Sequence, residues 1–317
     1  MCVFAKCPIP GRSKTRIAPL LGENGAACLA TAMLSDILVS LTTCEHLQNT
    51  LKILVYAPGS NEGELHMKSI LQSLNLSITS IKNGPSIFDG WILLPMASEA
   101  SKADLTSTSL GSKLEDALDK TRQLLTDVQD IVPSETNNQS VLFLGMDAPE
   151  VPLEEIAYGL TVSSTNKAHM CPADDGGYGL LSVPRDAPSS HIFSGVRWSN
   201  KLTAVSQLKA LSDCNIGISI GKMMNDIDEP GDVVRLAQRL MYSRNSCSSR
   251  DDSSSGNVKD DVLELPSSEI RGSSRFRDAN TNNVCKYTWE ALLDLNMITR
   301  SNDGCFCLSS DYDNMER

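Results

Sequence analysis

Apolar and polar positions alternate along the first 242 residues in a pattern that predicts short buried strands between amphipathic helices. Strands are expected at residues 2–5, 51–57, 91–94, 141–146, 178–183 and 216–220, and helices at 24–44, 62–74, 111–128, 152–162, 200–211 and 229–242. Strands and helices that follow one another in this way indicate an α/β fold with a mostly parallel sheet and helices on both faces. Such folds bind ligands at the carboxyl ends of the strands.

Two segments show the pattern in its clearest form. In the expected helix 24–44, Leu29, Met33, Ile37 and Leu41 recur at every fourth position, which places them on one face. The apolar run over 141–146 is typical of a buried parallel strand. The apolar runs stay far below the roughly 20 residues of a spanning helix, so we expect no transmembrane segment.

The composition changes near residue 243. Residues 243–256 read SRNSCSSRDDSSSG, which lacks apolar periodicity and predicts a serine-rich linker over 243–257. We therefore expect one domain over 1–242 and a C-terminal extension over 258–317 that is partly helical or disordered. A helix is expected at 286–298, and the extension either docks on the domain or stays mobile. Residues 96–110 are small and polar and predict a mobile loop.

Overall charge narrows the classes of partner. The 317 residues carry a formal net charge of −11 and the isoelectric point is about 4.9, which argues against nonspecific binding to nucleic acid or to an anionic membrane. Aromatic residues make up 5%, too few for a platform that stacks single-stranded bases. An anionic ligand would therefore need a local cluster of cations.

The cysteines and the N-terminus favour a reducing compartment. The ten cysteines form no C-x-x-C pair, and Lys6, Pro8 and Pro10 interrupt any apolar leader. We therefore expect reduced thiols, no secretory signal peptide and a cytoplasmic location.

A cluster of cations directly follows the first expected strand. Lys6, Arg12, Lys14 and Arg16 surround Gly11 in the segment FAKCPIPGRSKTRI. Arginine binds phosphate with two parallel hydrogen bonds, lysine supplies a mobile charge, and glycine lets the backbone approach a ligand. The segment lacks the glycine that a Walker A loop places before its lysine. It is either an anion site or a solvated basic turn, and its place after the strand favours the anion site.

Acidic residues follow two other expected elements. Asp147, in GMDAP after the strand 141–146, is placed either to hold Mg²⁺ or Mn²⁺ against a diphosphate or to cap the next helix. Asp228, in DIDEPGD, either caps the last helix, with Pro230 in its first turn, or faces Asp147 as a second metal ligand.

A further segment, PADDGGYG, places Asp175 before Gly176, Gly177 and Tyr178. The glycines permit close approach of the backbone, and their N–H groups can face a sugar or a phosphate. The alternative is a tight, hairpin-like turn, because Asp-Gly is a strong turn signal.

Taken in order, these motifs resemble those of the GT-A-fold nucleotide-diphosphosugar transferase superfamily. The closest resemblance is to a mainly bacterial glycosyltransferase branch, sometimes assigned to arsenosugar biosynthesis. Its pattern is F-A-K-x-P-x-P-G-x-x-K-T-R-L, G-x-D-x-P, P-A-x-D-G-G-Y, W-S-T and D-x-D-T-P-x-D. This chain has FAKCPIPGRSKTRI, GMDAP, PADDGGYG, WSN and DIDEPGD within residues 1–242. The 2-phospho-lactate guanylyltransferases are more distantly similar. Asn200 and Glu229 stand where the pattern has threonine.

The resemblance implies a Rossmann-like transferase domain and assigns roles to matching positions. The first loop would bind nucleotide phosphates through Lys6, Gly11, Arg12, Lys14 and Arg16. Asp147 would hold Mg²⁺ or Mn²⁺, with Asp228 as second ligand and Asp226 next in order. The glycine segment would face the sugar or acceptor through Asp175, Gly176, Gly177 and Tyr178, with Asp175 as the base for an acceptor hydroxyl.

The expected function is metal-dependent transfer of a sugar from a nucleotide-diphosphate sugar to a small-molecule acceptor. One alternative is a guanylyltransferase-like nucleotidyltransferase, which would release pyrophosphate from a nucleoside triphosphate. The other is a non-catalytic nucleotide-binding protein with the C-terminal extension as its interaction element. No nucleic acid partner and no membrane span are expected. Assembly into a homo-oligomer is left as an open alternative.

Overall fold

The computed structural model describes residues 1–96, 110–131, 140–162, 166–248, 285–301, 305–310 and 312. The loop expected at 96–110 therefore lies outside the described residues except at its two ends. The same holds for the part of the expected linker and extension that runs from residue 249 to residue 284.

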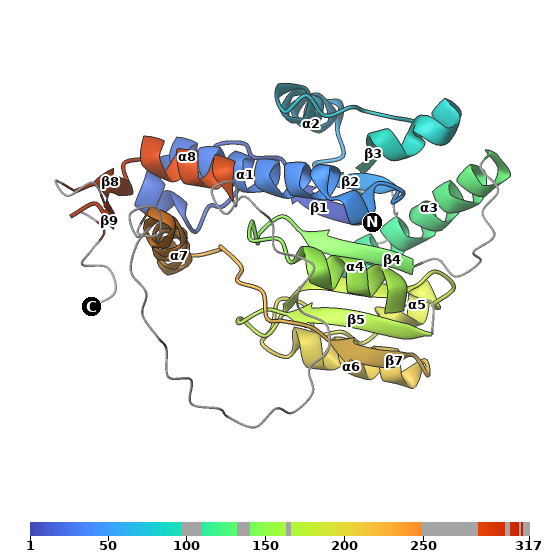
Figure 1. Ribbon diagram of the computed structural model, residues 1–317. Helices are drawn as coiled ribbons and strands as arrows, with labels where there is room; N and C mark the ends of the chain where they lie inside the picture. The colour runs from blue at the N-terminus through green and yellow to red at the C-terminus, as the bar shows by residue number, and fades with distance from the viewer. Residues whose placement is uncertain are drawn as a thin grey trace, which may run out of the picture.

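Within the described residues, seven strands form one sheet in the order β3-β2-β1-β4-β6-β5-β7 (Figure 1). The strands are β1 (Cys2–Lys6), β2 (Lys52–Ala57), β3 (Trp91–Pro95), β4 (Ser140–Gly145), β5 (Lys167–Pro172), β6 (Tyr178–Pro184) and β7 (Gly217–Ile220). Neighbouring strands are parallel except for β6, which runs antiparallel to β4 and β5. The predicted α/β fold with a mostly parallel sheet is confirmed.

Helices cover both faces of this sheet. They are α1 (Ala18–Thr43), α2 (Asn61–Ser73), α3 (Leu110–Ile131), α4 (Leu153–Val162), α5 (Ser189–Ile192), α6 (Thr203–Asp213), α7 (Pro230–Ser248) and α8 (Lys286–Asp294), with 3₁₀ turns at Glu45–Leu47 and Ile81–Asp89. On one face, Leu34 of α1, Met67 of α2 and Ile156 of α4 share an apolar cluster with the sheet. On the other face, Leu118 of α3 and Leu211 of α6 do so.

Helix α1 is apolar on more than one side. By length and composition alone it could cross a membrane, but 72% of its most apolar window is buried inside the protein. Leu34 and Ile37 face the sheet, whereas Leu29 and Met33 pack against α7 and α8. Burial on both sides accounts for the apolar composition of this helix.

The C-terminal segment docks on the domain, and residue 243 is not a boundary. The expectation of a linker from 243 is wrong at its start, because α7 continues through the serine-rich residues to Ser248. Arg244 stacks on Trp289 of α8, with 4.1 Å from its guanidinium carbon to the ring centroid. The Asn245 side chain exchanges two 3.1 Å hydrogen bonds with the backbone of Phe306. These contacts stabilise a helical turn that the local sequence does not favour.

Asp36 of α1 holds the start of α8. Its carboxylate accepts backbone N–H groups from Tyr287 at 2.9 Å and Thr288 at 2.7 Å. After α8, a hairpin of β8 (Ile298–Arg300) and β9 (Phe306–Leu308) completes the docked segment, which lies at the end of the molecule beside α1 and α7 (Figure 1).

Candidate active site

A cleft of about 360 Å³ opens at the carboxyl ends of β1 and β4. These strands are parallel neighbours, with Phe4 opposite Gly145, so the loops that follow them leave the sheet side by side. On its other side β1 pairs with β2, so the strand order reverses at this point. A reversal of this kind creates the crevice in which open α/β sheets bind ligands.

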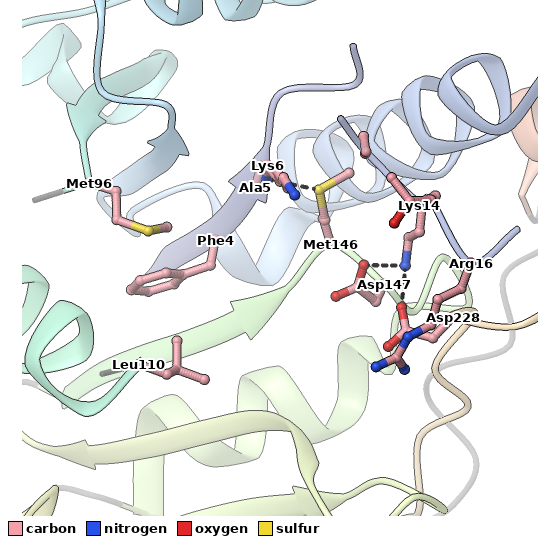
Figure 2. Close-up of a pocket in the computed structure, with 12 residues that line it drawn as sticks. Phe4, Ala5, Lys6, Lys14, Arg16, Met96, Leu110, Met146, Asp147 and Asp228 are labelled. Carbon is pink, nitrogen blue, oxygen red and sulfur yellow. Dashed lines mark hydrogen bonds and ion pairs between the residues drawn. The ribbon is translucent and has the colours of Figure 1, made fainter. Parts of the chain in front are cut away.

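Lys14 lines the cleft on the side where Asp147 and Asp228 lie (Figure 2). Its Nζ atom forms an ion pair with Asp147, lies 2.7 Å from Oδ1 of Asp228 and donates a 2.7 Å hydrogen bond to the Ile227 carbonyl. The Lys14 side chain is only 6% exposed. Burial by itself lowers the pKa of this ammonium group, but the attraction of the two carboxylates outweighs it, so the pKa is raised. Lys14 is therefore a buried cation between two acids.

The loop between β1 and α1 fixes Lys14 in this position. The Ile9 carbonyl accepts the N–H groups of Arg12 and Ser13, both at 3.0 Å, and the Lys14 carbonyl accepts that of Ile17 at 3.0 Å. Lys14 has a φ of +49°, a left-handed conformation that residues other than glycine rarely adopt. Ile17 is fully buried against α7 and α8, which anchors the end of the loop.

Asp228 reaches the cleft from the segment before α7. The buried Ile227 donates its N–H to the Asp147 carbonyl at 2.9 Å, which joins this segment to the end of β4. Asp232 accepts the N–H groups of Asp228 at 3.0 Å and Glu229 at 2.7 Å. Of the two alternatives for Asp228, the helix cap does not hold: the Asp232 side chain binds the N–H groups at the start of α7, and the Asp228 carboxylate faces Lys14.

Asp226 adds a further acid beside this pair. Burial raises its pKa to about 7, and repulsion from Asp147, Asp175 and Asp228 acts in the same direction, with Lys14 partly opposing it. The carboxylates of Asp147, Asp175 and Asp228 therefore surround Asp226 closely enough to disfavour its ionised form.

Two other cations of the first loop line the cleft, and two predicted residues do not. Lys6 and Arg16 belong to its lining, and the Arg16 side chain is 72% exposed, 4.0 Å from Glu229. Gly11 and Arg12 are not among the residues that line this cleft. Gly11 has a φ of +70°, and the Glu23 carboxylate lies 3.0 Å from where a Cβ would stand, so this glycine faces an acid.

The glycine segment forms a tight turn between β5 and β6, the alternative considered for it. Gly177 donates its N–H to Asp175 Oδ1 at 2.7 Å, and Gly176 donates to the Ala173 carbonyl at 3.2 Å. A Cβ on Gly176, whose φ is +89°, would lie 2.2 Å from the Lys201 carbonyl oxygen. The glycines are needed for the chain's own turn, and their N–H groups bond within it; contact of this segment with a sugar stays a prediction.

Tyr178 also has an internal partner. Its hydroxyl donates to Gln207 at 3.1 Å, its ring lies edge-on to Trp198, and burial raises its pKa. These contacts give Tyr178 a role in packing, and its contact with a sugar stays a prediction. Asp175 is exposed at the tip of the turn and is close enough to Asp226 to raise its pKa.

The apolar side of the cleft was not predicted from the sequence. Phe4, Met96 and Leu110 line it opposite the charged group (Figure 2). Phe4 could have been found from its position, since it alternates with buried Val3 and Ala5 near the carboxyl end of β1. Met96 and Leu110 belong to an expected loop, and no sequence pattern indicated that they line a cleft.

Comparison with known proteins agrees with this architecture. Residues 90–200 match a family described as "Uncharacterized protein conserved in bacteria (DUF2064)". That range includes Asp147 and the glycine turn but not Lys14 or Asp228. No curated protein matches the chain.

Among solved structures, a crystal structure from Desulfovibrio desulfuricans G20 is similar. It is described as a "putative nucleotide-diphospho-sugar transferase". The TM-score is 0.57 at 22% sequence identity, and the match covers 78% of this chain and 89% of that one. The chain therefore shares the α/β fold of this neighbour.

Proposed function

We propose that the chain is a metal-dependent glycosyltransferase that takes a sugar from a nucleotide-diphosphate sugar. The observation that carries this proposal is the Lys14 ammonium held between Asp147 and Asp228 at the carboxyl ends of β1 and β4. The edge of the sheet is the one at which such folds bind nucleotides. The description of the Desulfovibrio neighbour supports the substrate class.

The chemistry of the acidic residues fits Mg²⁺ or Mn²⁺. Asp147 and Asp228 offer only oxygen ligands, which hard divalent cations prefer. A cation, the Lys14 ammonium, already lies between them, and repulsion from neighbouring carboxylates adds to burial in raising the pKa of Asp226; both observations support a site for positive charge. Asp147 and Asp228 would hold the ion, which when bound neutralises a diphosphate and stabilises the leaving nucleotide.

Cations and apolar side chains of the cleft would bind the other parts of the nucleotide. Lys6, Lys14 and Arg16 line the same cleft and would contact phosphate oxygens. Phe4 and Leu110 provide an apolar surface for the base or sugar. The cleft volume of about 360 Å³ falls within the range of roughly 300–1,000 Å³ found for ligand pockets.

Product analysis tests the proposal. UDP-, GDP- and dTDP-sugars and the matching triphosphates are incubated with the protein, with and without Mn²⁺, using water as the default acceptor. Metal-dependent release of a nucleoside diphosphate from one sugar donor supports glycosyl transfer. Release of pyrophosphate from a triphosphate would instead indicate nucleotidyl transfer at the same site. Binding of a nucleotide without either product would indicate a non-catalytic protein.

A matched pair of variants assigns the activity to the cleft. Asp147→Asn should abolish most of the turnover, whereas Asp213→Asn, on an exposed ion pair with Lys209 at the end of α6, should not change it. Normal turnover by Asp147→Asn would refute the proposed metal site.

A further inference from the structure

Three side chains of metal-binding type converge outside the cleft, between α4 and strand β5. Glu155 lies on α4, and His169 and Cys171 lie two residues apart on the same face of β5. His169 Nε2 is 2.9 Å from Glu155 Oε2, and Cys171 Sγ is 3.8 Å from that nitrogen and 4.0 Å from that oxygen. His169 and Cys171 are buried, and the Glu155 side chain is 14% exposed.

We propose that Glu155, His169 and Cys171 form a binding site for Zn²⁺ or a similar thiophilic divalent cation. Tetrahedral Zn²⁺ with bonds of about 2.0–2.1 Å to nitrogen and oxygen and about 2.3 Å to sulfur keeps its ligand atoms roughly 3.3–3.6 Å apart. The observed separations of 2.9, 3.8 and 4.0 Å differ from this range by about 0.5 Å or less. Small rotations of the side chains suffice to bring all three atoms to one ion.

Gly221, at the end of β7, leaves the space that such an ion needs. A Cβ at Gly221 would lie 2.4 Å from Glu155 Oε2, 2.7 Å from Cys171 Sγ and 2.8 Å from His169 Cε1. The three ligand groups therefore point to the same place, and a side chain at position 221 would fill it. The backbone holds this cradle, because Gly221 donates its N–H to the Met170 carbonyl at 2.8 Å.

The Glu155 carboxylate is oriented from its other side. The Lys222 N–H donates to Glu155 Oε1 at 3.3 Å, which leaves Oε2 facing His169 and Cys171. Hydrogen bonds of this kind to a ligand carboxylate are typical of the surroundings of metal sites.

The geometry does not suit a nucleophilic triad. In such a triad one imidazole nitrogen faces the nucleophile and the other faces the acid, whereas here Nε2 of His169 faces both Cys171 and Glu155. Burial, with repulsion from Glu155, also raises the pKa of the Cys171 thiol to about 12, which keeps it protonated until a cation binds. Mixed sulfur, nitrogen and oxygen ligands select Zn²⁺ over Mg²⁺.

Binding sets the protonation of two groups. The ion would form bonds to Sγ, Nε2 and Oε2, and Cys171 would release its proton to solvent; the neutral imidazole that binds through Nε2 carries its proton on Nδ1. Nδ1 is buried without a hydrogen-bond partner among the described residues. We therefore expect weaker binding than at zinc sites whose second imidazole nitrogen is bonded. The ion would tie α4 to β5 and to the end of β7.

Cobalt titration of the full chain tests this site. After chelator treatment, Co²⁺ should add to one equivalent with a thiolate-to-cobalt charge-transfer band, and Zn²⁺ should displace it. Cys171→Ser should abolish the band, and Glu155→Gln should weaken binding at least tenfold. Cys214→Ser, at the end of α6, is the control and should keep the band.

Two results would overturn the proposal: no band in the wild-type protein, or a band that persists in Cys171→Ser. If Cys171→Ser does not fold, Glu155→Gln decides, because it retains the buried thiol and imidazole; unchanged affinity would then refute the site. Asp147→Asn should retain the band. The metal site of the proposed function has no sulfur ligand and gives no thiolate band. The two proposals can therefore fail independently.

Discussion

Replacing Lys14 with methionine removes the ammonium group between Asp147 and Asp228 and keeps a long side chain. Removing one partner of a fully buried ion pair costs about 3–5 kcal/mol. The Lys14 side chain is 6% exposed, but those of Asp147 and Asp228 are 41% and 48% exposed, so water replaces part of the lost interaction. We expect Lys14→Met to lower the free energy of unfolding by roughly 2–3 kcal/mol in metal-free buffer.

Divalent cations should reverse this loss. If Mn²⁺ binds Asp147 and Asp228 as proposed, the Lys14 ammonium would compete with it for the same carboxylates in the wild-type protein, and this competition would be absent in Lys14→Met. Mn²⁺ should therefore stabilise the variant more than the wild type. At 100 times the Kd of the variant, Mn²⁺ should add about 2.7 kcal/mol to the variant's own free energy of unfolding. Urea unfolding followed by circular dichroism, in chelator and in Mn²⁺, measures both effects.

Lys209→Met is the matched control. Lys209 lies 2.6 Å from Asp213, but their side chains are 75% and 61% exposed, so its loss should cost about 0.5 kcal/mol or less and should not respond to Mn²⁺. The reasoning would be refuted if Lys14→Met unfolded at the wild-type urea concentration, or if Mn²⁺ stabilised both proteins equally.

Other predictions concern stability. In the folded state the pKa of Asp226 is about 7, above its ordinary value of 3.8. The free energy of unfolding of the wild type should therefore fall as pH rises between these values, and Asp226→Asn should lessen the fall. Urea unfolding at pH 5 and pH 8 measures this, and an equal fall in both proteins would contradict it. Asp36→Ala leaves two backbone N–H groups of α8 unpaired and should cost about 2–3 kcal/mol, with faster hydrogen exchange in α8; unchanged exchange would count against this role. Gly176→Ala places a Cβ against the Lys201 backbone and should lower the free energy of unfolding by more than about 2 kcal/mol in urea. Gly195→Ala is the control, because its φ is +71° but the space around it is open, and it should cost about 1 kcal/mol. Equal losses in the two variants would contradict the predicted clash.

Periodicity predicted the elements whose burial is visible in their own residues. Helix α1 and strand β4 are examples, because their apolar side chains face the core directly. Strand β5 was not predicted, since KAHMCP shows no alternation. Its His169 is polar in the sequence yet buried in the structure, where Glu155 supplies the partner. That contact joins two elements and leaves no local signal.

The centre of the site was predictable, but parts of its surroundings were not. Lys14 and Asp147 follow parallel strands that end at one edge of the sheet, so their proximity follows from the fold. The orientation of Asp228 depends on the hydrogen bond from Ile227 to Asp147 and on capping by Asp232, which no local pattern encodes.

The role of the glycine turn was not decidable from residue types. A turn that needs Gly176 for its own backbone and a turn that binds a ligand have the same sequence signature. Likewise, the part of α7 beyond residue 243 contacts Trp289 and Phe306 from a distant part of the chain, and no local pattern encodes these contacts.

The most direct test of the central claim is the thermal unfolding of the wild-type protein and Asp147→Asn with Mn²⁺, with UDP or GDP, and with both together. Mn²⁺ and one nucleoside diphosphate should each raise the Tm of the wild type more when the other is present, because Asp147 and Asp228 would hold the ion and the ion would neutralise the diphosphate. This mutual dependence should be lost in Asp147→Asn. A rise in Tm with nucleotide that is the same without Mn²⁺, or the same in Asp147→Asn, would contradict it.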